Sequence, residues 1–96
     1  MKKLTEILNN IQPILIVGSI DISINALQLD SRKVMNSDVF FAIKGVSVDG
    51  HNFISKVIEQ GASAIVCEKI PTKKITNVTY IQVKDARQTS ALMACN

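Results

Sequence analysis

Apolar residues recur along this chain at helical spacing in three places, with strand-like segments between them. In the first place, Leu4, Ile7, Leu8 and Ile11 lie at i, i+3, i+4 and i+7, the spacing of one face of an amphipathic helix. Pro13 follows and cannot continue a helix. A first helix of about two turns is therefore predicted over residues 4–11.

A second helix is predicted just past the middle of the chain. Ile54, Val57 and Ile58 repeat at helical spacing. Asn52 is available as an N-cap, and Gly61 stands where a left-handed residue commonly ends a helix.

A third helix is predicted near the last residue. Asp85 precedes Gln88 by three positions, a variant of the capping box, and Ala91, Leu92 and Cys95 would share one face. No C-cap follows this face, so we expect an N-terminal domain whose chain continues into a larger protein.

Short apolar or alternating segments predict the strands. Ile20, Ile22 and Ile24 alternate with polar residues, as in a half-buried strand, and residues 26–29 are expected to extend that sheet. Residues 39–43 are apolar throughout, which predicts a central strand covered on both faces. Further strands are predicted at residues 14–17, at 64–67 and, by alternation, at 79–83.

Helices that alternate with strands predict an α/β fold, a small layered helix-sheet-helix domain. The chain has 96 residues, 47% of them hydrophobic and 20% charged, which suits one globular domain with one core. No apolar run approaches the roughly 20 residues that span a bilayer.

The two cysteines favour a cytoplasmic protein. Cys67 and Cys95 have no partner at metal-ligand spacing, and we expect both to be buried thiols in a reducing compartment. Polar residues from Glu6 to Gln12 interrupt the apolar stretch that a secretory signal peptide needs.

The net charge of +3 does not by itself indicate a nucleic-acid-binding protein. Its lysines and arginines are scattered, and four aromatic side chains are few for stacking bases. A stand-alone basic module that binds RNA or acidic partners therefore ranks below a site for a phosphate-bearing small molecule. A purely structural domain is a third hypothesis.

Two polar loops flank the predicted strand at residues 39–43. They carry Ser31 on one side and Gly45, Ser47 and Gly50 on the other. Short side chains and glycines at strand ends leave backbone amides available to phosphate or sugar oxygens. The sequence therefore predicts a binding site here, although it contains neither a phosphate loop nor a dinucleotide fingerprint.

Catalysis at these loops is not indicated. Ser47, Asp49 and His51 lie too close together in one turn for the geometry of a catalytic triad. Asp49 and Gly50 are expected to form a turn, with His51 helping to cap the helix that follows.

The charged residues beside the serines have mainly structural interpretations. Asp30 and Arg32 are expected to hold their loop by an ion pair, and the fork of Arg32 has a second interpretation, in which it reaches a diphosphate. Ser31 is either a turn hydroxyl or a ligand contact. Lys44 is expected to be a solvated charge at a strand end, with phosphate contact as the alternative.

The runs at residues 29–34, 38–45, 49–54 and 61–68 together resemble the N-terminal domain of the Mur ligases, which build the peptide of the bacterial cell-wall precursor. The resemblance covers nearly the whole chain. The opening helix and residues 80–87 look most like the branch that adds the third amino acid, meso-diaminopimelate or L-lysine, to UDP-N-acetylmuramoyl-L-alanyl-D-glutamate. The alternative is the branch that adds D-alanyl-D-alanine, which shares the Asp-Ser-Arg and Asp-Gly-His elements.

The resemblance implies a mixed sheet and an ATP-dependent ligase of peptidoglycan biosynthesis built from three domains. This chain, residues 1–96, would hold the uridine end of the UDP-N-acetylmuramoyl-dipeptide, with no nucleic acid and no membrane as partners. ATP and Mg²⁺ would bind a central domain and the amino acid a C-terminal domain, both absent from this chain. The fragment is thus expected to bind no cofactor, to carry no catalytic or metal-binding residue and to be inactive alone.

The resemblance also implies which residues contact the substrate. They are Leu29, Ser31, Val46, Ser47 and Val48. Some relatives carry larger polar side chains at the positions of Val46 and Ser47, so the contact of Val46 would be apolar or through its backbone. Leu29 and Val48 are suited to sandwich a uracil ring. The supporting loop residues are Asp30, Arg32, Asp49, Gly50 and His51.

Overall fold

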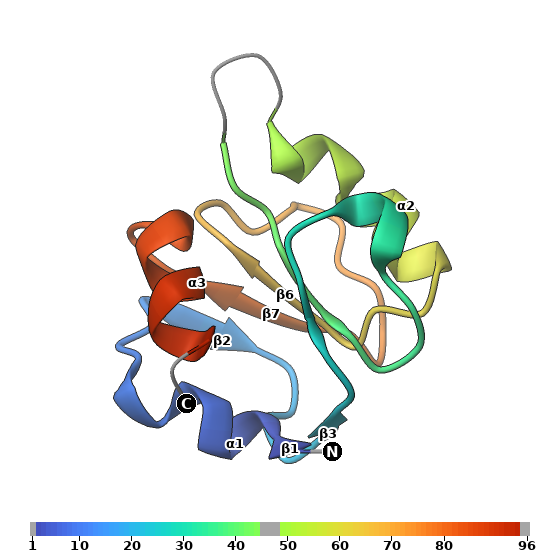
Figure 1. Cartoon of the computed structure of the whole chain (residues 1–96). Helices are drawn as coiled ribbons and strands as arrows, with labels where there is room; N and C mark the ends of the chain where they lie inside the picture. The colour runs from blue at the N-terminus through green and yellow to red at the C-terminus, as the bar shows by residue number, and fades with distance from the viewer. Residues whose placement is uncertain (1, 45–48, 95–96) are drawn as a thin grey trace.

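A mixed five-stranded sheet forms the centre of the protein in a computed structural model that describes residues 2–44 and 49–94 (Figure 1). The strand order is β2-β7-β6-β5-β4, with β2 antiparallel to β7 and the other neighbours parallel. The strands are β2 (Leu15–Val17), β4 (Leu27–Gln28), β5 (Val39–Phe41), β6 (Ala64–Cys67) and β7 (Thr79–Gln82). This arrangement confirms the small layered α/β domain with a mixed sheet.

Helices cover both faces of the sheet. The short helix α1 (Leu4–Ile7) and α3 (Ala86–Ala94) lie on one side, and α2 (Ile54–Glu59) lies on the other (Figure 1). Side chains alternate along β5 accordingly: Val39 and Phe41 pack with α1, and Phe40 packs with α2. The sheet thus separates two hydrophobic clusters, as a helix-sheet-helix domain requires.

The first helix is confirmed, although its second half is tighter than predicted. After α1 the chain continues as a 3₁₀ turn, η1 (Leu8–Asn10), in which the Ile11 amide donates to the Leu8 carbonyl over 2.9 Å. Pro13 disfavours helical backbone in the residue before it, so the chain leaves the helix here.

The strand predicted over Ile20, Ile22 and Ile24 is mostly wrong. Only β3 (Ser23–Ile24) forms, and it pairs with β1 (Lys2–Lys3) in a separate two-stranded sheet. The Ile22 carbonyl accepts instead from the Leu4 amide at the start of α1. Residues 26–29 therefore do not extend the sheet of β3; their strand β4 is an edge of the large sheet.

Two other strands differ in position or burial from the predictions. β5 is buried throughout, as predicted, but it lies second from the edge, and β6 is the central strand. β7 was predicted from alternation to be half-buried, yet Thr79, Tyr80 and Ile81 are all buried, because helices or loops cover both faces there.

The ends of α2 show one wrong prediction and one confirmed. Asn52 is not the N-cap, because it lies inside the 3₁₀ turn η3 (Gly50–Phe53), which runs directly into α2. Gly61 does follow the helix with a φ of +111°, and a Cβ there would meet the Asn36 backbone at 2.9 Å. The turn at this position therefore requires glycine.

α3 is capped as predicted but presents a different face to the core. The Gln88 amide donates to the Asp85 carboxylate over 3.1 Å. The buried residues at its start are Ala86 and Thr89, whereas Ala91 is exposed. Cys95 lies outside the described residues, while Cys67 is a buried free thiol, as predicted, and burial raises its pKa to about 11.

Candidate functional site

The two loops that the sequence singles out meet at one edge of the sheet. β4 and β5 are parallel neighbours, with Leu27 opposite Val39 and Gln28 opposite Phe40. Residues 29–32 leave the carboxyl end of β4, and the described residues 42–44 follow that of β5, with Gly50 packed beside them. The carboxyl ends of parallel strands are where open α/β sheets commonly bind ligands.

A cavity of about 620 Å³ opens between these loops. Its walls include five of the predicted site residues, and the rest of the lining comes from β5 and the loop after it, from η3 and from α2. The predicted residues are Leu29, Asp30, Ser31, Arg32 and Gly50, and the others are Phe40, Phe41, Ile43, Phe53 and Lys56. The predicted contacts Val46, Ser47 and Val48, and the neighbouring Gly45, lie outside the described residues.

The Asp-Ser-Arg loop is closed by its own charges, as predicted. It forms a 3₁₀ turn, η2 (Ser31–Lys33), and the Asp30 carboxylate accepts from the Arg32 backbone amide over 2.9 Å. The Arg32 guanidinium donates to the same carboxylate through Nε at 3.1 Å and Nη2 at 2.9 Å. These hydrogen bonds lower the pKa of Asp30 to about 2, so the carboxylate stays charged at neutral pH.

Two polar residues that sequence reasoning missed hold this loop in place. The side chain of Gln60, at the end of α2, donates to the carbonyls of Ser31 at 2.8 Å and Val34 at 3.1 Å. Asp38 is 1% exposed, and its carboxylate accepts from the Met35 amide at 2.9 Å and from the Gln28 side chain at 3.3 Å. A polar residue just before an apolar strand was the available signal for Asp38; Gln60 gave none, because its partners are backbone carbonyls about 30 residues away.

The Asp-Gly-His turn is built on the same local plan. The Asp49 carboxylate accepts from the His51 backbone amide over 3.0 Å and thereby caps η3. Gly50 packs against the end of β5, where an added Cβ would stand 2.7 Å from the Ile43 nitrogen. Only a residue without a side chain allows η3 to start this close to the strand.

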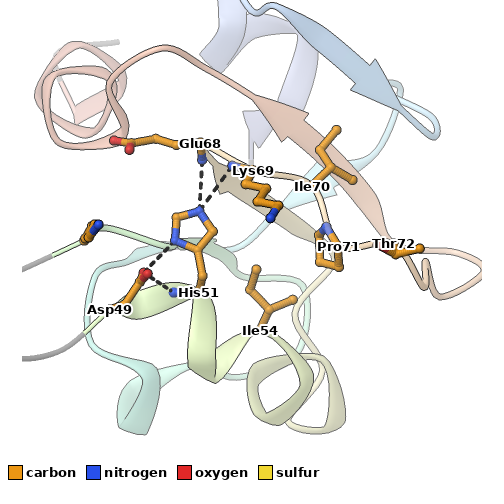
Figure 2. Close-up of a pocket in the computed structure, with 9 residues that line it drawn as sticks. Asp49, His51, Ile54, Glu68, Lys69, Ile70, Pro71 and Thr72 are labelled. Carbon is orange, nitrogen blue, oxygen red and sulfur yellow. Dashed lines mark hydrogen bonds and ion pairs between the residues drawn. The ribbon is translucent and has the colours of Figure 1, made fainter.

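His51 does not cap the helix as predicted, because Asp49 has that role. The His51 side chain makes other contacts. Its ring Nδ1 lies 2.7 Å from the Asp49 carboxylate, and its Nε2 accepts from the backbone amides of Glu68 at 3.1 Å and Lys69 at 3.3 Å (Figure 2). An accepting Nε2 leaves the proton on Nδ1, which donates to Asp49, whose pKa is lowered by the hydrogen bonds from His51. The ring therefore ties η3 to the end of β6.

This arrangement also argues against a catalytic triad. The Asp49 and His51 side chains do form a hydrogen-bonded pair. Two backbone amides already occupy Nε2, which a nucleophile would need.

A second cavity, of about 380 Å³, has the His51 ring on its wall (Figure 2). Asp49 and His51 line this cavity rather than the first, together with Lys44, Ile54 and residues 68–72. The Glu68 carboxylate is engaged elsewhere, because it accepts from the Ala86 amide at the start of α3 over 3.0 Å.

Neither a metal centre nor an ATP cradle is built by the residues described. Residues 2–44 and 49–94 contain no group of three or more His, Cys, Asp or Glu side chains arranged to hold a metal ion. The sequence also has no Gly-x-x-x-x-Gly-Lys-Ser/Thr loop. A search of the described residues for a helix long and apolar enough to cross a membrane finds none.

The structure is that of a small α/β domain with a cavity at the carboxyl ends of two parallel strands. A known family matches most of it: the Mur ligase family, catalytic domain, aligns with residues 23–95. The chain belongs to the Mur ligase family.

Curated relatives agree with this assignment. The chain is 44% identical over 94 residues to the UDP-N-acetylmuramoyl-L-alanyl-D-glutamate--2,6-diaminopimelate ligase 1 of Clostridium acetobutylicum, covering 98% of this chain and 19% of that protein. It is 46% identical over 84 residues to the UDP-N-acetylmuramoyl-L-alanyl-D-glutamate--2,6-diaminopimelate ligase of Bacteroides fragilis, covering 88% of this chain and 17% of that protein. The chain thus spans about a fifth of the length of these relatives.

Solved structures share the fold. MurF from Acinetobacter baumannii superposes with a TM-score of 0.64 at 28% identity, over 72% of this chain and 15% of that one. The MurF ligase from Thermotoga maritima in complex with ADP gives a TM-score of 0.63 at 34% identity, over 73% and 16%.

Proposed function

We propose that this chain is the N-terminal domain of a ligase that adds the third amino acid, meso-diaminopimelate or L-lysine, to UDP-N-acetylmuramoyl-L-alanyl-D-glutamate. Its task is to bind the uridine nucleotide end of that substrate. The cavity at the ends of β4 and β5 carries the proposal, since Leu29 and Ser31 line it together. The curated relatives at 44% and 46% identity bear the name of this ligase.

The cavity wall suits such a ligand chemically. Leu29 is 61% exposed and lies on the cavity wall, so its side chain is accessible to an apolar part of a ligand. Phe53 offers a second apolar surface, and the Ser31 hydroxyl can donate to a ribose or uracil oxygen. Val46, Ser47 and Val48 are proposed to complete the contacts.

Catalysis is assigned to the rest of the full-length protein. The proposal gives ATP and Mg²⁺ to the central domain and the incoming amino acid to the C-terminal domain, and derives no chemical step from this chain. The isolated chain is proposed to be inactive. A cytoplasmic location belongs to the same proposal, and a buried free thiol at Cys67 is consistent with it.

The D-alanyl-D-alanine-adding branch is the second candidate. The two solved structures described above are both of MurF, the ligase of that branch. Their identities of 28% and 34% are lower than the 44% and 46% of the diaminopimelate ligases. The first branch is therefore preferred.

An amide-resolved NMR titration tests the binding function. UDP and UDP-N-acetylmuramoyl-L-alanyl-D-glutamate are added separately to the 96-residue chain, with a short RNA at matched salt as the comparison. We expect saturable shifts confined to the loops at residues 29–32 and 42–50. Absence of shifts with both nucleotides at millimolar concentration, combined with salt-sensitive shifts spread over the surface with RNA, would favour a basic module instead.

A further inference from the structure

The charged side chains around the cavity at the ends of β4 and β5 differ in how free they are to bind a ligand. The charged side chains on its wall, within the part of the chain that the structure describes, are Asp30, Arg32 and Lys56. Asp30 and Arg32 form a two-point ion pair, at 3.1 Å and 2.9 Å, and so largely neutralise each other. Among the described residues of the wall, Lys56 therefore carries the one positive charge that no carboxylate neutralises.

Arg32 is poorly placed to bind a second anion. Its Nε and Nη2 both donate to Asp30, which the short hydrogen bonds keep ionised. A diphosphate could use only the N–H groups of the guanidinium that Asp30 leaves free, and the ionised Asp30 carboxylate beside them would repel it. This makes the second interpretation of Arg32, contact with a diphosphate, the weaker of the two.

Lys56 is not held in an ion pair of this kind by any described residue. It lies in the first half of α2, its side chain is exposed, and within residues 2–44 and 49–94 no carboxylate lies within ion-pair distance of its ammonium group. A lysine ammonium on a flexible four-carbon stem reaches phosphate oxygens without a fixed geometry. The same wall carries Ser31 from η2 and Phe53 from η3, so base, sugar and phosphate groups have separate partners.

We infer that Lys56 is the residue of this domain that binds the diphosphate of the nucleotide. The inference rests on the proposed function and adds a residue that the Asp-Ser-Arg and Asp-Gly-His motifs do not contain. In this arrangement Ser31, Leu29 and Phe53 contact the uridine, Arg32 supports the loop through Asp30, and Lys56 provides the charge that distinguishes UDP from uridine.

Binding of UDP and of uridine to Lys56→Gln tests this assignment. Glutamine has a helix propensity close to that of lysine and the site is exposed, so the fold should be unaffected. The expected result is a dissociation constant for UDP raised about 5-fold, the size of an exposed charge pair, with uridine binding unchanged. The UDP affinity of the variant should also fall less steeply between 50 and 200 mM salt than that of the unaltered chain.

Lys33→Gln is the matched control. It removes the same charge from η2, beside the cavity but not on its wall, and should leave the affinity for UDP near that of the unaltered chain. If Lys56→Gln binds UDP as tightly as the unaltered chain, or weakens UDP and uridine equally, the assignment of Lys56 is overturned while the proposed function stands. If the unaltered chain binds neither UDP nor uridine, the proposed function fails and this inference fails with it.

Discussion

The Asp-Ser-Arg and Asp-Gly-His loops follow one local plan and differ in what they hold. In each loop an aspartate accepts from the backbone amide two residues later and from that residue's side chain: Asp30 from Arg32, and Asp49 from His51. Beyond the aspartate, the Arg32 side chain is 82% exposed, whereas the His51 ring is 19% exposed. The first motif closes its loop locally, and the second also fixes its loop to the central strand.

The comparison shows why two similar tripeptides contribute differently to the stability of the fold. Arg32 has solvent beyond its carboxylate partner, so water replaces its hydrogen bonds readily. The Nε2 of His51 faces two backbone amides at the end of β6, which find no other acceptor among the contacts of the described residues. Loss of the ring therefore leaves the part-buried Glu68 amide without its acceptor, whereas the more exposed Lys69 amide can bind water instead.

Replacing each side chain with alanine should give the largest difference between the loops. We expect His51→Ala to lower the free energy of unfolding by about 2 kcal/mol, because the part-buried Glu68 amide loses its acceptor and the packing of a mostly buried ring is lost as well. Arg32→Ala should leave it unchanged within error. Urea denaturation measures the stability, and amide hydrogen exchange should show protection lost at Glu68 and Lys69 in His51→Ala alone.

His51→Gln is the control for this comparison, since its carbonyl oxygen retains an acceptor near the same amides. Partial recovery of their protection is expected. Equal losses of stability in His51→Ala and Arg32→Ala would show that the second loop is no better anchored than the first.

The Asp-Ser-Arg loop has its own tie to the rest of the domain, through Gln60 rather than through Arg32. Gln60→Ala should cost about 1 kcal/mol, because the carbonyls of Ser31 and Val34 lose their shared donor. Glu59→Ala, a neighbouring exposed position, is the control. Chemical shifts should change at residues 31–34 in Gln60→Ala and stay in place in Glu59→Ala; unchanged shifts in both would contradict the role of Gln60.

These contacts explain how much of the fold and of the site could be predicted from the sequence. Helical and strand spacing located α2, β5 and β6, and the motifs located Leu29, Ser31 and Gly50 on one cavity wall. The pairing of β3 with β1, and the hydrogen bonds of Gln60 and His51 to distant backbone groups, join residues that lie 17 to 29 positions apart. Periodicity carries no record of such contacts. The wrong cap at Asn52 has a local cause instead, because the 3₁₀ turn η3 precedes α2 and its start is capped by Asp49.

The smallest expected effect concerns the protonation of the Asp30 carboxyl. Hydrogen bonds from Arg32 lower its pKa from the ordinary 3.8 to about 2, so the folded state binds this proton less tightly than the unfolded state does. The ion pair therefore adds stability above pH 3.8, and that contribution is lost as the pH falls toward 2. An NMR titration of the Arg32 amide should show a midpoint near 2, and the step should vanish in Asp30→Asn, which retains a cap but no titrating group. A midpoint at or above 3.8 would mean that the Arg32 fork is not bound to Asp30 in solution, and would return Arg32 to consideration as an anion ligand beside Lys56.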